Sequence, residues 1–409
     1  MNFLFAWRYF KAKKSANAIN IIAWVTVSVI AFATACQILV LSVFNGFEDL
    51  VKSLYASFYT DIKIIPQKGK TFILTAVQIQ SIKKQPGING ISLIAEEKAL
   101  LKNEDIQTIV YLKGVDDNYA NVSGVASRTV EGEFNTGTLD DPGLIVGGGI
   151  QNAAGINVDG ALRPSRVTLL LPRKGLFSIN DPSQSLSEGI VRANGVFAIQ
   201  QEFDNKYVIT NIDFVKRQMG FAKDEYSAAE IKLNNKTALE TAKKDLTALI
   251  GNNYLVQTKY EQNTSLYSTM KLEKWAIYAI LTLILVVAAF NMISALTMLV
   301  LEKQKDISVL QSMGANKHLI QKIFLTEGLL LGAIGAVAGI VLAIIVCFLQ
   351  LRFKLVKLQG GSFLIDYFPV KLQVSDFLLV ASTVAIIAFI ASWYPARKAS
   401  AQSIELRGT

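Results

Sequence analysis

The sequence predicts an α-helical membrane protein with four transmembrane helices and a large α/β domain outside the bilayer that carries a β-rich insertion. Three observations support this fold class. The chain is 51% apolar and only 18% charged, whereas a soluble domain has about a quarter charged residues. Four uncharged runs each reach the roughly 20 residues that a spanning helix needs. A single long stretch of mixed composition, residues 48–274, separates the first run from the second.

The N-terminal residues 1–17 are rich in aromatic side chains and lysines, which favours a short helix on the cytoplasmic membrane interface. The tryptophans Trp7, Trp24, Trp275 and Trp393 lie at or near the ends of apolar runs, where interfacial belts place them. The expected transmembrane helices are 18–47, 275–301, 326–351 and 377–396, joined by a loop at 302–325 and another at 352–376, with a tail at 397–409.

The domain at 48–274 shows alternating strand and helix signals. One α/β subdomain is expected from residues 48–115 and 206–274, around a β-rich insertion at 116–205. The signals for the α/β part are strands at 61–65, 91–101, 107–113, 229–233 and 254–257, with helices at 76–85 and 237–250.

Orientation is predicted from the basic residues of the short segments, which concentrate on the cytoplasmic side. Four basic residues fall in the loop between the third and fourth spans. The opposite side has eleven, namely Arg8, Lys11, Lys13, Lys14, Lys303, Lys305, Lys317, Lys322, Arg397, Lys398 and Arg407. We therefore expect a multi-pass inner-membrane protein with both termini cytoplasmic and a periplasmic domain.

The residues that catalysis would need are scarce. His318 is the single histidine, and the cysteines Cys36 and Cys347 lie in apolar runs, which argues against metal sites and catalytic nucleophiles. A phosphate-binding GxxxxGK[ST] loop does not occur, and Gly147–Gly149 fits a simple turn. We expect a non-enzyme without a cofactor, a metal or a nucleic-acid partner. Because the spans contain no mid-membrane charge, energy for transport would come from a partner.

The cytoplasmic segment 302–314 predicts a short amphipathic helix. Ile307, Leu310 and Met313 recur at helical spacing, and Gly314 suits the position after a helix end. Two interpretations remain open. The apolar stripe could lie on lipid headgroups as the chain re-enters the membrane, or it could dock in a groove of a partner.

Two further helix faces are marked by their spacing. In the third span, small residues share one face and permit close helix packing, more often within one chain than between subunits; they are Gly328, Gly332, Gly335 and Gly339. At the end of the first span, Val40, Phe44 and Phe47 lie at i, i+4 and i+7. The pattern alone favours packing of this second face against the other spans.

Three stretches resemble the permeases of the lipoprotein-releasing ABC system, within the FtsX/MacB-type permease superfamily. LSVFNGFE at 41–48 is similar to the family's LSVMNGFE, with Phe44 in place of methionine. EKQKDISVLQSMGA at 302–315 looks like the family's cytoplasmic segment, with Asp306 for the usual glutamate. YPARKA at 394–399 resembles the signature after the last span. The order of spans agrees along essentially the whole chain.

The resemblance implies that two permeases, identical or paralogous, pair with two copies of a cytoplasmic ATPase that binds ATP-Mg. ATP-driven closure would push the lever helices and expel an acylated lipoprotein from the membrane lipid to a periplasmic carrier. It assigns ATPase coupling to Glu302, Lys303, Asp306, Ile307, Leu310, Met313 and Gly314. It assigns lipoprotein binding to Val40, Phe44, Asn45, Phe47 and Glu48, and it aligns Pro172, Arg173 and Lys174 with a carrier-binding loop.

Two other functions fit the same architecture. A permease of this superfamily could instead export peptides or drugs, or control a cell-wall hydrolase. A membrane receptor with a periplasmic sensing domain is the alternative from another class, although the inner loop leaves little room for an output domain.

Overall fold

The computed structural model describes residues 17–158, 164–174, 185–234, 237–358 and 367–401. The chain divides into two compact units. The membrane unit comprises Met1–Leu50 and Ser268–Thr409, and the extramembrane domain comprises Val51–Tyr267. The interfacial helix expected at 1–17 lies almost entirely outside the described residues, as does most of the tail expected at 397–409.

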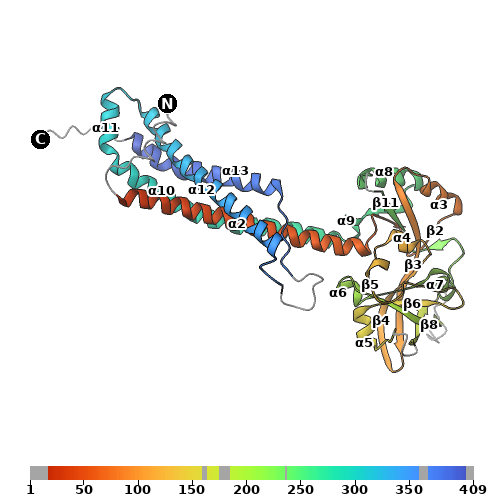
Figure 1. Ribbon diagram of the computed structural model, residues 1–409. Helices are drawn as coiled ribbons and strands as arrows, with labels where there is room; N and C mark the ends of the chain where they lie inside the picture. Colours follow the sequence, from red (N-terminus) through yellow and green to blue (C-terminus); the bar gives the residue numbers. More distant parts are fainter. Residues whose placement is uncertain (1–16, 159–163, 175–184, 235–236, 359–366, 402–409) are drawn as a thin grey trace. The chain divides into compact units, whose positions relative to one another are not determined.

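Four helices are long and apolar enough to cross a membrane. They are α2 (Asn17–Phe58), α10 (Thr264–Glu302), α12 (Lys317–Phe353) and α13 (Val374–Ser400) (Figure 1). All four exceed the spans expected from hydropathy: α2 continues past residue 47, α10 begins before 275, α12 begins before 326, and α13 covers 374–400 where 377–396 was expected. Lipid sets the length of an apolar run, but a helix continues until a residue breaks it. The segment 48–58 contains neither proline nor glycine, so α2 continues through it.

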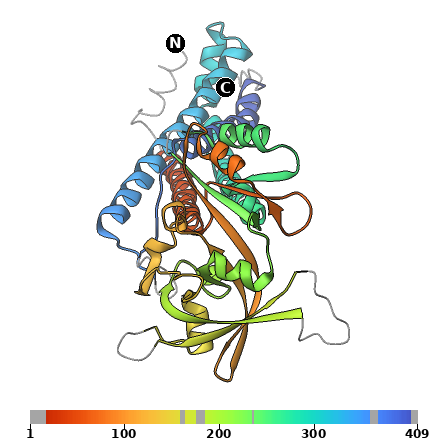
Figure 2. The same ribbon diagram turned by 90° about the vertical axis from the view of Figure 1, so that its right-hand side faces the viewer.

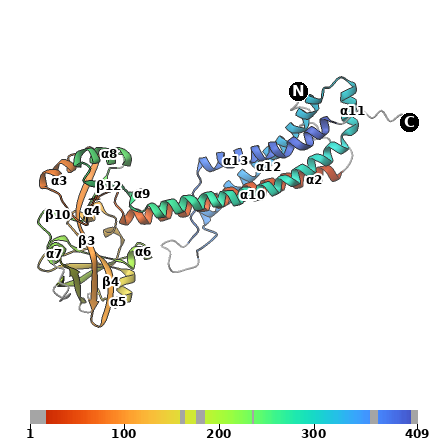
Figure 3. The ribbon, with the colours of Figure 1, turned by 180° about the vertical axis from the view of Figure 1, so that it is seen from behind.

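The four helices share one apolar core. Met292 of α10, Leu331 of α12 and Val384 of α13 are buried in it with Ile38 of α2. The helices α2 and α10 run side by side (Figure 3), and their contact includes a hydrogen bond of 3.2 Å from Gln37 Nε2 to Thr282 Oγ1. The fully buried Gln37 is an intramembrane polar residue that the sequence analysis did not single out.

The extramembrane domain is built on a ten-stranded sheet with the order β12-β1-β11-β3-β4-β9-β6-β8-β5, and β7 pairs with both β3 and β8. The long strand β3 crosses the domain (Figure 2). The strand bounds are β1 Ile62–Pro66, β3 Ile88–Asn103, β4 Ile106–Val115, β5 Thr129–Gly132, β6 Gly143–Gly147, β7 Arg166–Pro172, β8 Leu186–Phe197, β9 Tyr207–Asn211, β11 Ala228–Leu233 and β12 Tyr254–Thr258. A separate two-stranded sheet pairs β2 (Phe72–Ile73) with β10 (Glu225–Tyr226).

The predicted insertion at 116–205 is continuous with the rest of the domain. Its strands β5, β6, β7 and β8 belong to the same sheet as the α/β strands, joined through β9 and through the pairing of β7 with β3. Sequence patterns identify strands one at a time, whereas pairing between distant strands decides how many sheets they form. The α/β part and the β-rich part therefore share one sheet.

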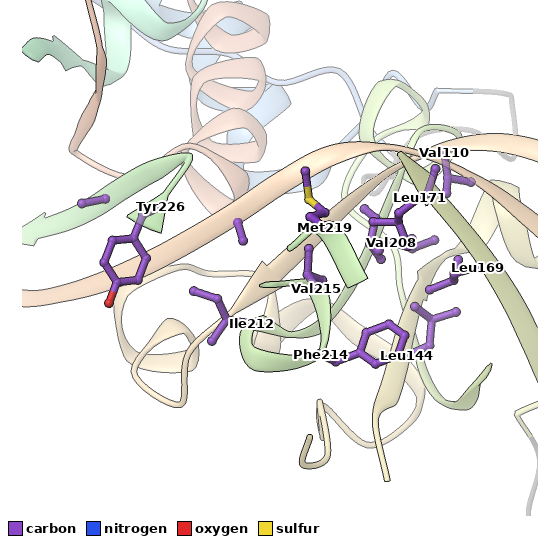
Figure 4. Packing of buried hydrophobic residues seen from close by; sticks show 14 of the residues in the cluster. Val110, Leu144, Leu169, Leu171, Val208, Ile212, Phe214, Val215, Met219 and Tyr226 are labelled. Carbon is purple, nitrogen blue, oxygen red and sulfur yellow. The ribbon is translucent and has the colours of Figure 1, made fainter. Parts of the chain in front are cut away.

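Short helices cover this sheet and complete its core (Figure 4). In α7 (Ile212–Met219), Asn211 caps the first turn and Phe214, Val215 and Met219 are buried. Along β8 the side chains alternate between buried and exposed, as expected for a strand with one covered face. The remaining helices of the domain are α3 (Ala76–Lys83), α4 (Tyr119–Val122), α5 (Gly148–Ala154), α6 (Gln201–Asp204), α8 (Leu239–Ile250) and α9 (Lys259–Gln262), with a 3₁₀ turn at Ala126–Arg128.

A buried ion pair lies inside the domain. Lys113 Nζ of β4 is 2.8 Å from Glu230 Oε1 of β11, and both side chains are at most 3% exposed. The ammonium also lies 4.8 Å from the ring centroids of Phe58 and Tyr119. Burial lowers the pKa of Lys113, but the Glu230 carboxylate and its neighbours outweigh burial and hold this pKa above its usual value.

Candidate functional site

The NGFE segment lies in the last part of α2 that belongs to the membrane unit. Asn45 is 1% exposed there. Its Nδ2 donates to Asp376 Oδ2 at 2.5 Å and to the Lys371 carbonyl at 3.4 Å, and its Oδ1 accepts from Lys274 Nζ at 2.8 Å. Lys274 Nζ is also 3.2 Å from Asp376 Oδ1. This Asn45 cluster, formed by Asn45, Lys274, Lys371 and Asp376, joins α2, α10, α13 and the loop before α13.

The cluster places a carboxylate where a helix favours one. Asp376 lies in the first turn of α13, where the positive end of the helix dipole stabilises negative charge. Only 4% of Asp376 is exposed, and it has two strong partners in Lys274 and Asn45. Each charge is therefore paired or hydrogen-bonded, as burial requires.

The next two residues of the motif hold the loop between α12 and α13 against α2. A Cβ on Gly46 would lie 2.3 Å from the Pro369 carbonyl oxygen, so only glycine allows this approach. The rings of Phe47 and Phe368 meet edge to face with centroids 5.7 Å apart. In the same contact, the Lys371 N–H donates to the Ser42 carbonyl at 2.9 Å.

The face predicted to bind lipoprotein is thus divided. Val40 is 40% exposed, and Phe44 and Phe47 are half-buried, so this side of α2 is partly open. Asn45 and Gly46 instead lie inside the contact with the loop, and Glu48 is half-buried. Asn45, which the resemblance assigns to lipoprotein binding, is therefore buried against the loop in this structure.

The predicted lever is a helix, α11 (Gln304–Ser312), between α10 and α12 (Figure 1). Ile307 is 2% exposed and packs in a small core with Val300, Ile320, Phe324 and residues of α13. Ile307 and the half-buried Leu310 also line a small pocket between α11 and α12. Ile307 therefore faces the core of the chain in this structure, and its assignment to ATPase coupling stays a prediction.

The outward face of α11 carries two exposed apolar residues, of which the sequence predicted one. Met313 is 79% exposed, as the lever interpretation requires, and Val309, which the sequence analysis did not name, is 59% exposed. Lys303 forms an ion pair with Asp306 at 3.1 Å near the start of the helix. Glu302 is the last residue of α10, and Gly314 has a φ of +92°, which suits glycine after a helix end.

Beneath α11, a buried carboxylate lines the pocket. Glu327 of α12 is 3% exposed and lies with Lys303, Ile307 and Leu310 around that pocket. The sequence alone did not single out Glu327, because hydropathy does not show which side of a helix end is buried.

The four glycines of α12 make close contacts within the chain. A Cβ on Gly328 would lie 2.2 Å from Ser392 Oγ, and one on Gly332 would lie 2.6 Å from Ala388 Cβ, both on α13. Gly335 and Gly339 face α2 instead, where a Cβ on Gly339 would lie 2.4 Å from the Ala31 carbonyl oxygen. The stripe allows α12 to pack closely against two helices at once.

In the extramembrane domain, Pro172 ends β7, and it lines an open groove of about 450 Å³ with the next two residues, Arg173 and Lys174. The Lys174 N–H donates to the Met219 carbonyl at 3.0 Å, and its ammonium pairs with Glu225. Lys174, Thr71 and the Ala222 N–H lower the pKa of Glu225 against the opposing effect of burial. The rest of the aligned loop, residues 175–184, lies outside the described part of the chain.

Comparisons with known proteins agree with this architecture. Residues 278–404 match the family described as FtsX-like permease C-terminal. The chain is 27% identical to the lipoprotein-releasing system transmembrane protein LolE of Haemophilus influenzae, over 97% of this chain and 96% of that protein. It is 26% identical to LolC of Neisseria meningitidis serogroup B, with the same coverage of each chain. The periplasmic region of MacB from Actinobacillus actinomycetemcomitans gives a TM-score of 0.37 at 13% identity, covering 54% of this chain and 98% of that one.

The chain is accordingly similar to FtsX-like permeases, whose C-terminal family model it matches over residues 278–404. Within this class, its similarity to LolE and LolC extends over nearly its whole length.

Proposed function

We propose that this permease extracts acylated lipoproteins from the outer leaflet of the inner membrane and passes them to a periplasmic carrier. Two copies of a separate ATPase drive it, and a second permease, identical or paralogous, completes the complex. The proposal places both termini in the cytoplasm and the extramembrane domain in the periplasm. The similarity to LolE and LolC over 97% of the chain is the observation that carries the proposal.

The surface of α2 supports this substrate class. Val40, Phe44 and Phe47 leave apolar side chains partly open near the end of the span. Acyl chains bind such surfaces because each buried CH₂ contributes about 0.8 kcal/mol. Removing acyl chains from a bilayer is correspondingly costly, and a chain that has no ATP-binding loop needs a partner to supply that energy.

A photo-crosslinking residue at Phe44 tests the substrate. In the complete complex with its ATPase, we expect adducts with an acylated lipoprotein that decrease when ATP is added. The matched control is Phe32, which lies on the same helix and is 68% exposed; its adducts should be with lipid and should not respond to ATP. Adducts at Phe44 that contain only lipid or the permease itself would contradict lipoprotein release.

The outward face of α11 tests the ATPase partner. Met313→Asp changes an exposed side chain, so the small core around Ile307 should remain intact. We expect normal membrane insertion and loss of the ATPase on co-purification, because a charge would enter an apolar groove of the partner. Ser312→Asp on the same helix is the control, since it adds the same charge at an exposed polar position. Full recovery of the ATPase with Met313→Asp would favour the membrane re-entry interpretation.

A further inference from the structure

The last two residues of α12 and the four that follow them form a turn, Arg352–Lys357. Its conformation is fixed by Gln350, which is 7% exposed. Gln350 Nε2 donates to the carbonyls of Val356 at 3.1 Å and Phe368 at 3.2 Å, and its Oε1 accepts from the Val356 N–H at 2.9 Å. One buried amide therefore holds both sides of the turn.

The backbone adds further restraints. Lys354 ends α12 in the left-handed region, with a φ of +50°, and its N–H donates to the Gln350 carbonyl at 2.8 Å. The Phe368 N–H donates to the Val356 carbonyl at 3.1 Å, and Lys357 pairs with Tyr367 in an antiparallel bridge. This backbone is ordered by its own hydrogen bonds.

The turn nevertheless exposes its apolar side chains. Phe353 is 63% exposed, Leu355 is 66% exposed and Val356 is 54% exposed. Arg352, Lys354 and Lys357 alternate with them and are also exposed, and no acidic residue lies in the segment. The Lys354 ammonium lies 4.2 Å from the centroid of the Tyr367 ring. The result is a fixed surface with three positive charges and three apolar side chains.

The position of this surface points to its partner. The turn continues directly from the end of a transmembrane helix, so it lies at the level of the lipid headgroups. Apolar side chains at that level enter the acyl boundary, while basic side chains remain with the phosphates. We propose that the turn Arg352–Lys357 is a docking surface for an anionic phospholipid in the leaflet at this end of α12.

Tryptophan quenching by brominated lipids tests the proposal in the full chain. Phe353→Trp exchanges one exposed aromatic residue for another and places the reporter in the turn. Each basic residue near a membrane surface contributes about fivefold to binding of an anionic lipid, so Arg352 and Lys357 together contribute about 25-fold. In mixed micelles, we therefore expect half-maximal quenching by brominated phosphatidylglycerol at about a 25-fold lower mole fraction than by brominated phosphatidylcholine. The added variant Arg352→Gln/Lys357→Gln should bring the ratio close to one. Lys354 is retained because its ammonium contacts Tyr367.

The matched control is Leu283→Trp, on a side chain of α10 that is 65% exposed and has no basic neighbour from 276 to 290. Its quenching ratio should be close to one with or without the Arg352 and Lys357 substitutions. If Phe353→Trp disturbs folding, Leu355→Trp provides a second reporter. Equal quenching by the two lipids at the turn would overturn the proposal, as would protection from both lipids, which would indicate a protein partner on this surface.

Discussion

Each of the two units contains a lysine paired with a carboxylate from a distant part of the chain, and the two pairs differ in their surroundings. Lys113 and Glu230 are enclosed between strands and aromatic rings, with both side chains at most 3% exposed. Lys274 lies within α10 and Asp376 lies in the first turn of α13, and the lysine side chain is 26% exposed. The first pair has few polar neighbours, and Glu230 Oε2 has no hydrogen-bond partner among the described residues. The second pair shares Asn45 and a loop carbonyl.

This difference indicates what each pair does. A buried pair recovers its desolvation cost only while both partners are present, so it strongly penalises loss of one of them. A partly open pair with additional hydrogen bonds loses less when one charge is removed. We therefore regard the Lys113 pair as part of the fixed centre of the sheet and the Asn45 cluster as a restraint on one loop.

The largest effect is expected for Lys113→Met, which leaves the Glu230 carboxylate buried and unpaired. We expect a loss of about 3–5 kcal/mol in the free energy of unfolding of the extramembrane domain. Pulse proteolysis of the detergent-solubilised full chain in urea would measure it. Lys63→Met is the control, because Lys63 is 3.9 Å from Glu230 but 21% exposed, and about 1 kcal/mol or less is expected. Equal losses in the two variants would remove the distinction between enclosed and open pairs.

Packing of the membrane unit should be the next most sensitive feature. Gly339→Ala places a Cβ against the Ala31 carbonyl, and such overpacking costs about 1–3 kcal/mol. We expect a lower melting temperature in detergent, with little change for Ala338→Val on the exposed side of α12. Similar destabilisation by both variants would mean that the cost of an added side-chain group does not depend on how closely α12 is packed at that position.

A smaller effect is expected for Asp376→Asn, which removes the charge opposite Lys274 but keeps the shape of the side chain. Because Lys274 is partly solvated, we expect a loss of about 1–2 kcal/mol, well below that of Lys113→Met. Limited proteolysis in the loop before α13 should accelerate, which would report on the restraint. Asp49→Asn tests the exposed Lys371–Asp49 pair and should change neither quantity. A loss as large as that of Lys113→Met would contradict the comparison.

The smallest effect is expected at the groove, where Glu225 pairs with Lys174. Because the pKa of Glu225 is lowered in the folded chain, its contribution is fully present above the unfolded value of about 4.3. That contribution is lost as the pH falls through the folded pKa. The melting temperature of Glu225→Gln should therefore lie below that of the native chain at pH 7 and approach it near pH 3. A difference that does not depend on pH would assign the effect to packing.

The sequence predicted those features that depend on neighbouring residues. Hydropathy located the four spans, and the spacing of Gly328 to Gly339 located a close-packing face. Features that depend on distant residues were missed: Lys274 and Asp376 are 229 and 331 positions from Asn45. An amphipathic pattern also does not show which core its apolar face joins. For that reason Ile307 was expected to face a partner, although it packs within the chain while Val309 faces outward.

The Asn45 cluster also sets an order of events during biosynthesis. Asn45 is made early, but Asp376 follows 331 residues later. At about 5–20 residues per second, the ribosome needs roughly 20–60 s to cover that distance. Throughout this interval the first span lies in the membrane with an amide that has not yet met its final partners. Insertion machinery, lipid headgroups or water must accommodate that amide until the last helix arrives. A delay in translation before α13 would therefore prolong the interval in which Asn45 lacks its final partners.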